Sequence, residues 1–249
     1  MKPWPYPRLM AHRAGGTVAP ENTLAGIRMG ASLGFRAVEI DVRFSRDDVP
    51  VLQHDAAIDR NTNGKGLLAE KDWVELAGVD AGIWRGEAYR GEPMARLADA
   101  AALLKALHVV PHVEIKRVRG REREIGGRVA DEVALHWQGA AEVPLLISFS
   151  AEALEGARDR QPGLQRGFIA ESPWDEDIGV LERLDAASLH LEHPLITPEL
   201  ANVLHERGRR LVAWTVNDVV RAEALLAMGV DGIVTDNIRE FAARFPKLL

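Results

Sequence analysis

Carboxylate side chains recur at two-residue spacing in two short apolar segments of the sequence. Glu39 and Asp41 lie in one segment, and Glu114 lies two residues before Lys116 in another. Because side chains two residues apart share one face of a β-strand, each pair points in a common direction. Three carboxylates that converge away from water need neutralisation, which a hard divalent cation with oxygen ligands provides. We therefore predict that Glu39, Asp41 and Glu114 bind one divalent cation, Ca²⁺ or Mg²⁺.

Two histidines end neighbouring apolar segments, each beside a charged residue. His12 precedes Arg13, and His54 precedes Asp55. Two imidazoles on opposite sides of a reacting group can act as general base and general acid near neutral pH. The forked guanidinium of Arg13 suits phosphate oxygens. A structural interpretation stays open, in which these histidines only support the fold and the carboxylates pair with Arg13 or Lys116.

For other candidate ligand-binding residues, the sequence indicates a role less clearly. Trp214 alternates with core positions, a pattern that fits either stacking against a ligand or ordinary packing. His190 and His193 lie where contact with a ligand is plausible, and the sequence assigns them no role. The basic stretch 116–123 contains interleaved glutamate and no aromatic residue, which indicates a solvated loop entering a helix rather than a nucleic-acid site.

Short apolar runs separated by amphipathic stretches must position these side chains. The runs are bounded by Gly or Pro and are rich in β-branched residues, as in strands buried on both faces. The predicted strands are Arg8–Ala11, Ala37–Val42, Val109–Ile115, Leu145–Phe149, Gly167–Ala170, Ser188–Leu191, Leu211–Val216 and Gly232–Thr235. The predicted helices include Thr23–Leu33, Ala153–Arg160, Pro198–Arg207 and Val219–Met228. This alternation predicts an α/β fold, a (β/α)₈ TIM barrel, with a doubly wound open sheet as the alternative.

One interval breaks the alternation and predicts an insertion after the second strand. Residues 43–108 are too long for one connection and one helix. They contain a hairpin arm over Val49–Gln53, a polar loop over 59–66 and a short helix near Asp72–Leu76. Such an insertion follows the carboxyl end of a strand, the end at which barrel enzymes build their active sites. Without a linker or a second hydrophobic core, we predict one domain over residues 1–249 with a small cap.

Composition limits the classes of function. The chain has 249 residues, no cysteine and a net charge of −6. It therefore lacks disulfides and thiol chemistry, and its acidity argues against nucleic acid or an anionic membrane as a partner. No apolar run approaches the roughly 18 residues of a membrane span. Because residues 1–8 contain no secretory signal, we expect a cytoplasmic protein with a small-molecule partner. The oligomeric state stays open.

The ordered set of short motifs resembles the glycerophosphodiester phosphodiesterases, and the opening Trp4–Arg8 is similar to their cytosolic bacterial form. The likeness covers nearly the whole chain. It is carried by His12-Arg13, Pro20–Thr23, Glu39–Asp41, His54-Asp55, Thr62–Gly64, Asp80–Trp84, Gly91–Pro93, Glu114–Lys116, Trp214–Asn217 and Val230–Asp236. Ala14 departs from the glycine common after His-Arg in the family, which concerns the backbone of the phosphate loop and removes no functional side chain.

This resemblance implies metal-dependent hydrolysis of glycerophosphodiesters, such as glycerophosphocholine or glycerophosphoethanolamine, to an alcohol and sn-glycerol 3-phosphate. Glu21 would be either a metal ligand or a partner that orients His12 or Arg13. The remaining implied roles are catalysis by His12 and His54, metal binding by Glu39, Asp41 and Glu114, phosphate binding by Arg13 and Lys116, and a glycerol contact from Trp214.

Two other classes of function stay open on the sequence alone. A barrel of the class I aldolase type would use Lys116 as a Schiff base, although the neighbouring carboxylates would keep that lysine charged. A barrel that only binds or senses a ligand is the other alternative, since fold alone does not fix function. For the hydrolase itself, the first nucleophile is either water or the 2-hydroxyl of the glycerol arm.

Overall fold

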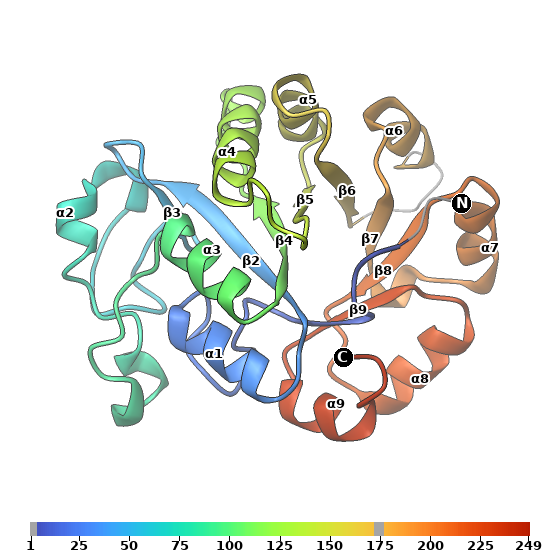
Figure 1. Cartoon of the computed structure of the whole chain (residues 1–249), viewed down its shortest axis with the longest axis horizontal. Helices are drawn as coiled ribbons and strands as arrows, with labels where there is room; N and C mark the ends of the chain where they lie inside the picture. Colours follow the sequence, from blue (N-terminus) through green and yellow to red (C-terminus); the bar gives the residue numbers. More distant parts are fainter. Residues whose placement is uncertain (1–3, 172–176) are drawn as a thin grey trace.

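The computed structural model describes residues 4–171 and 177–249, and there the strands form one closed barrel (Figure 1). Residues 1–3, which belong to the segment searched above for a secretory signal, lie outside this description. The barrel strands are β1 (Leu9–Ala11), β2 (Ala37–Phe44), β4 (Val110–Ile115), β5 (Leu145–Ser148), β6 (Gln165–Ala170), β7 (Ser188–Glu192), β8 (Arg210–Trp214) and β9 (Gly232–Thr235). All of them pair in parallel, and β1 pairs with both β9 and β2. This closure confirms the TIM barrel and makes the open-sheet alternative wrong.

Helices follow the barrel strands and surround the barrel in Figure 1. They are α1 (Leu24–Ser32), α3 (Leu97–Ala106), α4 (Glu122–His136), α5 (Ala151–Arg160), α6 (Asp177–Leu184), α7 (Pro198–Glu206), α8 (Val219–Ala227) and α9 (Ile238–Arg244). Thr23, Thr197 and Asp218 cap the first turns of α1, α7 and α8 through their side-chain oxygens. Among the described residues no helix has the length and apolar character needed to cross a membrane.

The insertion between β2 and β4 packs beside the barrel, on the left of Figure 1. Its strand β3 (Pro50–Leu52) pairs antiparallel with β2, and its helix α2 (Trp73–Leu76) starts with a capping box, so the predicted hairpin arm and short helix are confirmed. It also contains the 3₁₀ turns η1 (Leu68–Glu70), η2 (Ile83–Arg85) and η3 (Glu87–Tyr89).

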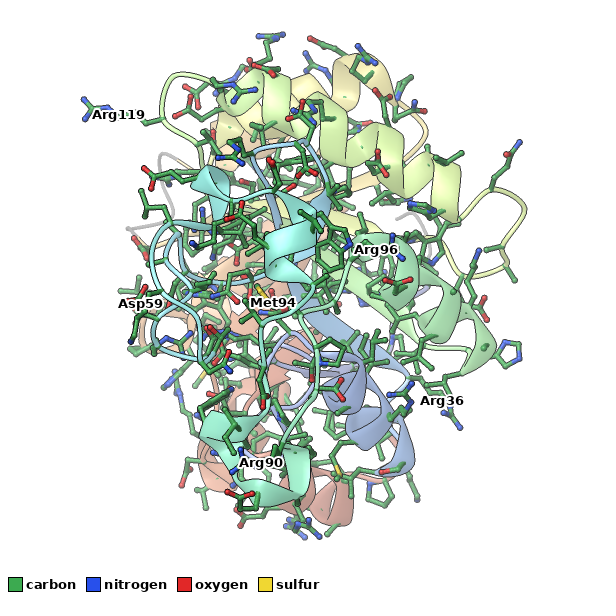
Figure 2. The ribbon with its side chains drawn as sticks, turned by 90° about the vertical axis from the view of Figure 1, so that its left-hand side faces the viewer. Arg36, Asp59, Arg90, Met94, Arg96 and Arg119 are labelled. Carbon is green, nitrogen blue, oxygen red and sulfur yellow. The ribbon has the colours of Figure 1, made fainter. Side chains whose placement is uncertain are left out.

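The insertion also has an apolar cluster of its own, which the sequence prediction missed. The cluster is separate from the barrel core and includes Ile58, Leu68, Leu76 and Met94, with Met94 at the centre of the insertion in Figure 2. These apolar residues are scattered over a stretch without regular periodicity, so only the folded chain brings them together.

Strand register decides which side chains meet inside the barrel. Asp41 lies opposite Glu114 in the β2–β4 pair, and Glu39 lies opposite His112. Alternation then turns Glu39, Asp41, His112 and Glu114 inward, while the intervening apolar residues face the helices. The inward carboxylates sit toward the carboxyl ends of the two strands, where the loops that carry function emerge.

Helices α4 and α5 approach so closely that glycine is required at their contact. A Cβ on Gly126 would lie 1.8 Å from the carbonyl oxygen of Ala153, and one on Gly156 would lie 1.9 Å from that of Arg123. Both obstacles are backbone atoms, so neither helix can relieve the overlap by a side-chain rotation. The helices that cover β4 and β5 must therefore move apart if either glycine gains a side chain.

We predict that Gly126→Ala lowers the free energy of unfolding by about 1–3 kcal/mol, the usual cost of overpacking. Chemical denaturation measures it. Gly179→Ala in α6 is the matched control, because no atom lies within 4 Å of its Cβ position. There the change should raise stability by about 0.5–1 kcal/mol, the ordinary gain of alanine over glycine within a helix. Equal effects at the two positions would contradict the proposed close contact.

Candidate active site

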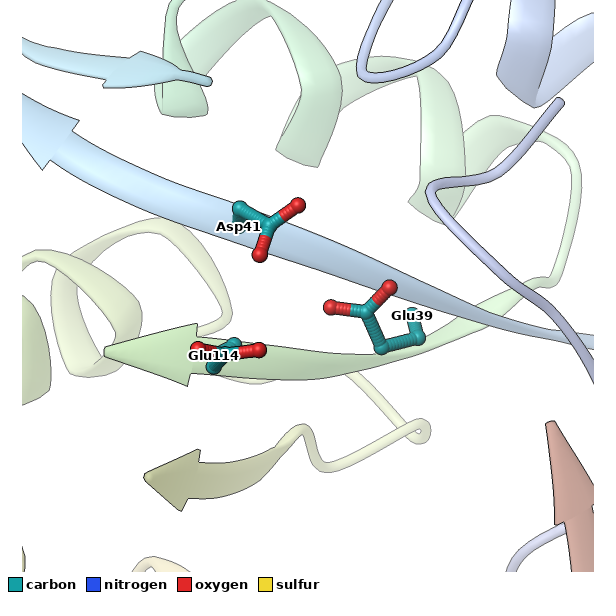
Figure 3. A group of neighbouring side chains, drawn as sticks. All are labelled: Glu39, Asp41 and Glu114. Carbon is teal, nitrogen blue, oxygen red and sulfur yellow. The ribbon is translucent and has the colours of Figure 1, made fainter. Parts of the chain in front are cut away.

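The three predicted carboxylates converge at the mouth of the barrel (Figure 3). Glu39 and Asp41 project from the same side of β2, and Glu114 projects toward them from β4. One oxygen of each lies within 4.8 Å of the others, and the three residues are only 4%, 1% and 8% exposed. Burial and the charge of Asp41 raise the pKa of Glu39 to about 8 and that of Glu114 to about 7. Among the described residues, these three side chains form a group whose oxygens lie close enough together to share one metal ion.

Positive groups from the chain neutralise only part of this cluster. Lys116 Nζ lies 2.7 Å from Glu114 Oε1 and 3.1 Å from Asp41 Oδ1. Burial alone would raise the pKa of Asp41, but Lys116, His54 and Arg13 outweigh it and hold that pKa below its usual range. Burial likewise lowers the pKa of Lys116, and the two carboxylates reverse the shift. An amine held protonated in this way is a poor Schiff-base nucleophile, which weighs against the aldolase-type alternative.

The cluster has the donor set for a divalent cation. Glu39 Oε1 is buried and has no hydrogen-bond partner among the described residues. Asp41 Oδ1 is also without a hydrogen bond there, since its contact with Lys116 is an ion pair that lacks hydrogen-bond geometry. Buried carboxylate oxygens without partners are costly, and hard cations such as Mg²⁺ and Ca²⁺ prefer oxygen ligands. Glu39, Asp41 and Glu114 can therefore hold a metal ion.

His12 reaches the cluster from the end of β1 and is fixed by a residue from the end of β9. Its Nδ1 lies 2.7 Å from Asp236 Oδ1, and its Nε2 lies 3.8 Å from Glu39 Oε2. Burial lowers the pKa of His12, but the hydrogen bond to Asp236 and the nearby carboxylates raise it overall. Asn217 holds the second oxygen of Asp236 through its amide at 3.1 Å. The imidazole thus presents Nε2 to the barrel mouth.

His54 approaches from the insertion and has a comparable carboxylate partner. Its Nδ1 lies 2.8 Å from Asp55 Oδ1, and Arg60 Nε donates to the other oxygen of Asp55 at 2.5 Å. Burial and Lys116 lower the pKa of His54, against the opposing charge of Asp41. The two predicted histidines therefore share one arrangement, in which Nδ1 is bound to an aspartate and Nε2 is left free of it.

Arg13 lies in a turn that places its side chain beside the carboxylates. Arg13 and Ala14 have φ values of 48° and 64°, in the left-handed region that non-glycine residues rarely occupy. The turn thus forms even though Ala14 stands where the family commonly has glycine. Its position is fixed because the Arg13 amide donates to Glu39 Oε2 at 2.9 Å.

Glu21 contacts arginines rather than the other carboxylates. Its oxygens accept hydrogen bonds from Arg13 Nη1 at 3.1 Å and from both Nη atoms of Arg60. Glu21 lies outside the group of three potential metal ligands. Of the partners considered above, it is Arg13 that Glu21 touches in the structure.

A cavity of about 150 Å³, called the pocket below, connects these side chains. One wall is polar and the opposite wall is apolar, the latter with Ile147, Phe149, Ile169 and Trp214. The polar wall consists of His12, Arg13, Glu39, His54 and Glu114. Trp214 packs edge-to-face on Phe149, with ring centroids 5.5 Å apart. The pocket therefore offers charged groups to a small anion on one side and an apolar surface to its carbon chain on the other.

Comparisons with known proteins place the chain in a family of phosphodiesterases. A family model described as the glycerophosphoryl diester phosphodiesterase family matches residues 12–240. The chain belongs to this family. A glycerophosphodiester phosphodiesterase of Caldanaerobacter subterraneus is 30% identical over 233 residues, which cover 92% of this chain and 93% of the relative. This protein is thus a hydrolase of the phosphodiesterase class.

Solved structures give the same result. A phosphodiesterase of Oleispira antarctica, solved with the product sn-glycerol-3-phosphate, superposes with a TM-score of 0.90 at 31% identity, over 97% of each chain. A glycerophosphodiester phosphodiesterase of Agrobacterium tumefaciens has a TM-score of 0.80 at 24% identity, over 95% of this chain and 99% of that one, and supports the fold alone.

Several residues of the site escaped the sequence prediction. Asp236, Asn22 and Arg60 lie in or beside the motifs named above without an assigned role. The Asn22 side chain donates to Asp41 Oδ2 at 2.7 Å, and its oxygen accepts from the Asp41 amide. The signal for Asp236 was its position after the last predicted strand, where polar side chains gather. Without the closed barrel, nothing indicates that it reaches His12.

His190 is buried at the pocket floor, whereas His193 lies outside the pocket. His190 Nε2 lies 3.1 Å from Ser188 Oγ, and its ring packs against that of His112. Burial lowers the pKa of His190 to about 3. Because the unfolded chain takes up this proton at higher pH than the folded chain, protonation of His190 acts against the folded state.

We predict that the contribution of His190 to the free energy of unfolding falls as pH drops from about 6.5, the unfolded value, toward 3. The slope from His190 alone is about 1.4 kcal/mol per pH unit, and denaturant titrations at several pH values measure it. His190→Gln should reduce the slope. His108→Asn, at a side chain 80% exposed, is the control and should retain it. An unchanged slope in His190→Gln would overturn the prediction.

Proposed function

We propose that this phosphodiesterase cleaves glycerophosphodiesters to an alcohol and sn-glycerol 3-phosphate by histidine acid–base catalysis with one divalent cation. The observation that carries the proposal is the pair of imidazoles on one pocket, each bound through Nδ1 to its own aspartate and beside three clustered carboxylates. The likeness to the Oleispira antarctica phosphodiesterase, whose structure contains the product sn-glycerol-3-phosphate, supports the same product here.

In this proposal Glu39, Asp41 and Glu114 hold Ca²⁺ or Mg²⁺. When bound, the cation acts as a Lewis acid on the phosphate oxygens and offsets the charge of the diester. Glu39 Oε1 and Asp41 Oδ1, buried without hydrogen bonds to described residues, are the oxygens best suited to ligation. The chain's contribution is a rigid oxygen donor set on two paired strands.

Arg13 and Lys116 bind the phosphate. The buried Nε of Arg13 donates no hydrogen bond to a described residue, and a phosphate oxygen supplies the missing acceptor. Glu21 orients the guanidinium through the hydrogen bond to Nη1. Donors already positioned for the charge that develops on phosphorus stabilise the transition state without reorganising. Trp214 and the apolar wall contact the glycerol arm.

The two histidines move the protons. One imidazole Nε2 accepts the proton of the nucleophile as its oxygen bonds to phosphorus. The other donates a proton to the alcohol oxygen as the P–O bond to the alcohol breaks, so His12 and His54 exchange protonation states over the step. The nucleophile is water or the 2-hydroxyl of the glycerol arm, which would give a cyclic phosphate that water then opens. Acid–base catalysis of this kind contributes about 10²–10⁴-fold for each proton transfer.

We predict that chelator-treated protein releases no sn-glycerol 3-phosphate and that added Mg²⁺ or Ca²⁺ restores release, measured by a coupled assay. Glu114→Gln should abolish the activity that added metal restores. The thermal unfolding profile of this variant should keep the shape of the wild-type profile. Glu206→Gln, at the exposed end of α7 and outside the pocket, is the control and should retain activity. Near-full turnover in chelator would refute the metal assignment, and a wild type that binds glycerophosphodiesters without cleaving them would favour a sensing barrel.

We predict that Asp236→Asn lowers kcat by about 10²–10⁴-fold with little change in KM, because His12 loses the carboxylate that fixes its orientation. Steady-state kinetics with saturating metal measures both constants. Asp231→Asn is the matched control: Asp231 holds His205 Nε2 at 2.8 Å in a similar pair before β9, away from the pocket. It should cost stability and leave kcat unchanged. A normal kcat for Asp236→Asn would remove Asp236 from the mechanism.

A further inference from the structure

A second hollow adjoins the pocket beyond β4. It has a volume of about 230 Å³ and shares two wall residues, Glu114 and Phe149, with the pocket. Its other lining residues are Arg43, Ile115, Lys116, Arg117 and Glu171. A phosphodiester has two arms, and Glu114 of the carboxylate cluster stands at the boundary between the two spaces. With phosphorus at the cluster and the glycerol arm in the pocket, the leaving alcohol extends into this hollow.

The hollow has a surplus of positive charge. Glu114 and Lys116 neutralise one another through their 2.7 Å ion pair. Among the lining residues, what remains is Arg43 and Arg117 against Glu171. From outside the lining, Asp41 and Asp55 act on Arg43, and Glu152 lies within electrostatic range of Arg117. Arg43 is half-buried, and its Nε donates to the carbonyl oxygen of His54 at 2.9 Å, which fixes the side chain. Neither of its Nη atoms donates a hydrogen bond to a described residue, so the guanidinium retains donors for a ligand.

Arg117 stands at the rim of the hollow in a defined position. Its Nη2 donates to the carbonyl oxygen of Phe149 at 2.8 Å, and its guanidinium lies 5.8 Å from the centroid of the Phe149 ring. The aromatic ring therefore already has a cation over it. A quaternary ammonium would compete with Arg117 for that ring and would be repelled by both arginines, whereas a phosphate would gain two forked donors.

We propose that this hollow is the leaving-group site and that it selects an alcohol with an anionic group of its own, such as a second phosphate. The inference rests on the proposed function and adds the class of alcohol to it. Guanidinium groups bind phosphate through paired hydrogen bonds, which adds geometric selectivity to the attraction of charge. Glu171 opposes this preference, and its removal strengthens it.

The experiment compares three substrates that differ in the charge of the alcohol. They are glycerophosphoinositol 4-phosphate, glycerophosphoinositol and glycerophosphocholine, assayed on the full chain with saturating metal. The wild type should show the highest kcat/KM for the phosphorylated alcohol and the lowest for choline. The first two substrates differ by one phosphate alone, so their ratio isolates the effect of charge. This ratio should shrink at high ionic strength, because the hollow is open to solvent.

Arg117→Glu should lower the ratio between phosphorylated and unphosphorylated inositol ester by about fivefold to tenfold, since it replaces an attraction by a repulsion. Glu171→Gln should raise the same ratio. Arg119→Glu is the matched control, since Arg119 lies two positions along the same loop and extends away from the molecule (Figure 2). All three side chains are exposed, so the variants should fold as the wild type does.

The outcomes separate the inference from the function on which it rests. If the wild type cleaves all three substrates but prefers choline, or if Arg117→Glu and Arg119→Glu give equal ratios, the leaving-group assignment is wrong and the phosphodiesterase function stands. If the wild type cleaves none of the three with either cation, the proposed function itself fails.

Discussion

Three buried carboxylates within 4.8 Å of one another impose the constraint on which the rest of the site depends. Ionised carboxylates repel at this range, and burial removes the water that would screen them. Without a metal ion, the chain responds by raising the pKa of Glu39 and Glu114 and by placing Lys116 against the cluster. Each surrounding feature can be understood as a way of holding this charge in place.

The side chains and amides that hold the carboxylates and histidines come from several segments of the chain. Asn22 fixes Asp41 from the β1–α1 connection, and the Arg13 amide fixes Glu39. Two aspartates hold the histidines from different segments, one on the insertion and one after β9. Because these contacts come from the β1–α1 connection, the insertion and the end of β9, the cluster requires segments that are distant in the sequence. No short segment of the chain could form it alone.

The opposite wall of the pocket has a different character and completes the site. Phe149 lines both the pocket, whose apolar wall includes Trp214, and the more basic hollow that contains Arg117. A diester that spans this boundary meets different chemistry at each arm. Recognition of the glycerol side and selection of the alcohol can therefore be separated in the same protein, since they involve different side chains.

The local content of the sequence was sufficient for the strands, for the limits of α1, α5, α7 and α8, and for the carboxylate face. Alternation at two-residue spacing is a property of the extended backbone, so Glu39 and Asp41 share a face wherever β2 lies. Barrel closure decided the rest. His12 and Asp236 are 224 positions apart and meet only because β1 pairs with β9. The insertion cluster, the hold of Arg60 on Glu21 and the basic hollow likewise depend on contacts between distant segments, which no local periodicity encodes.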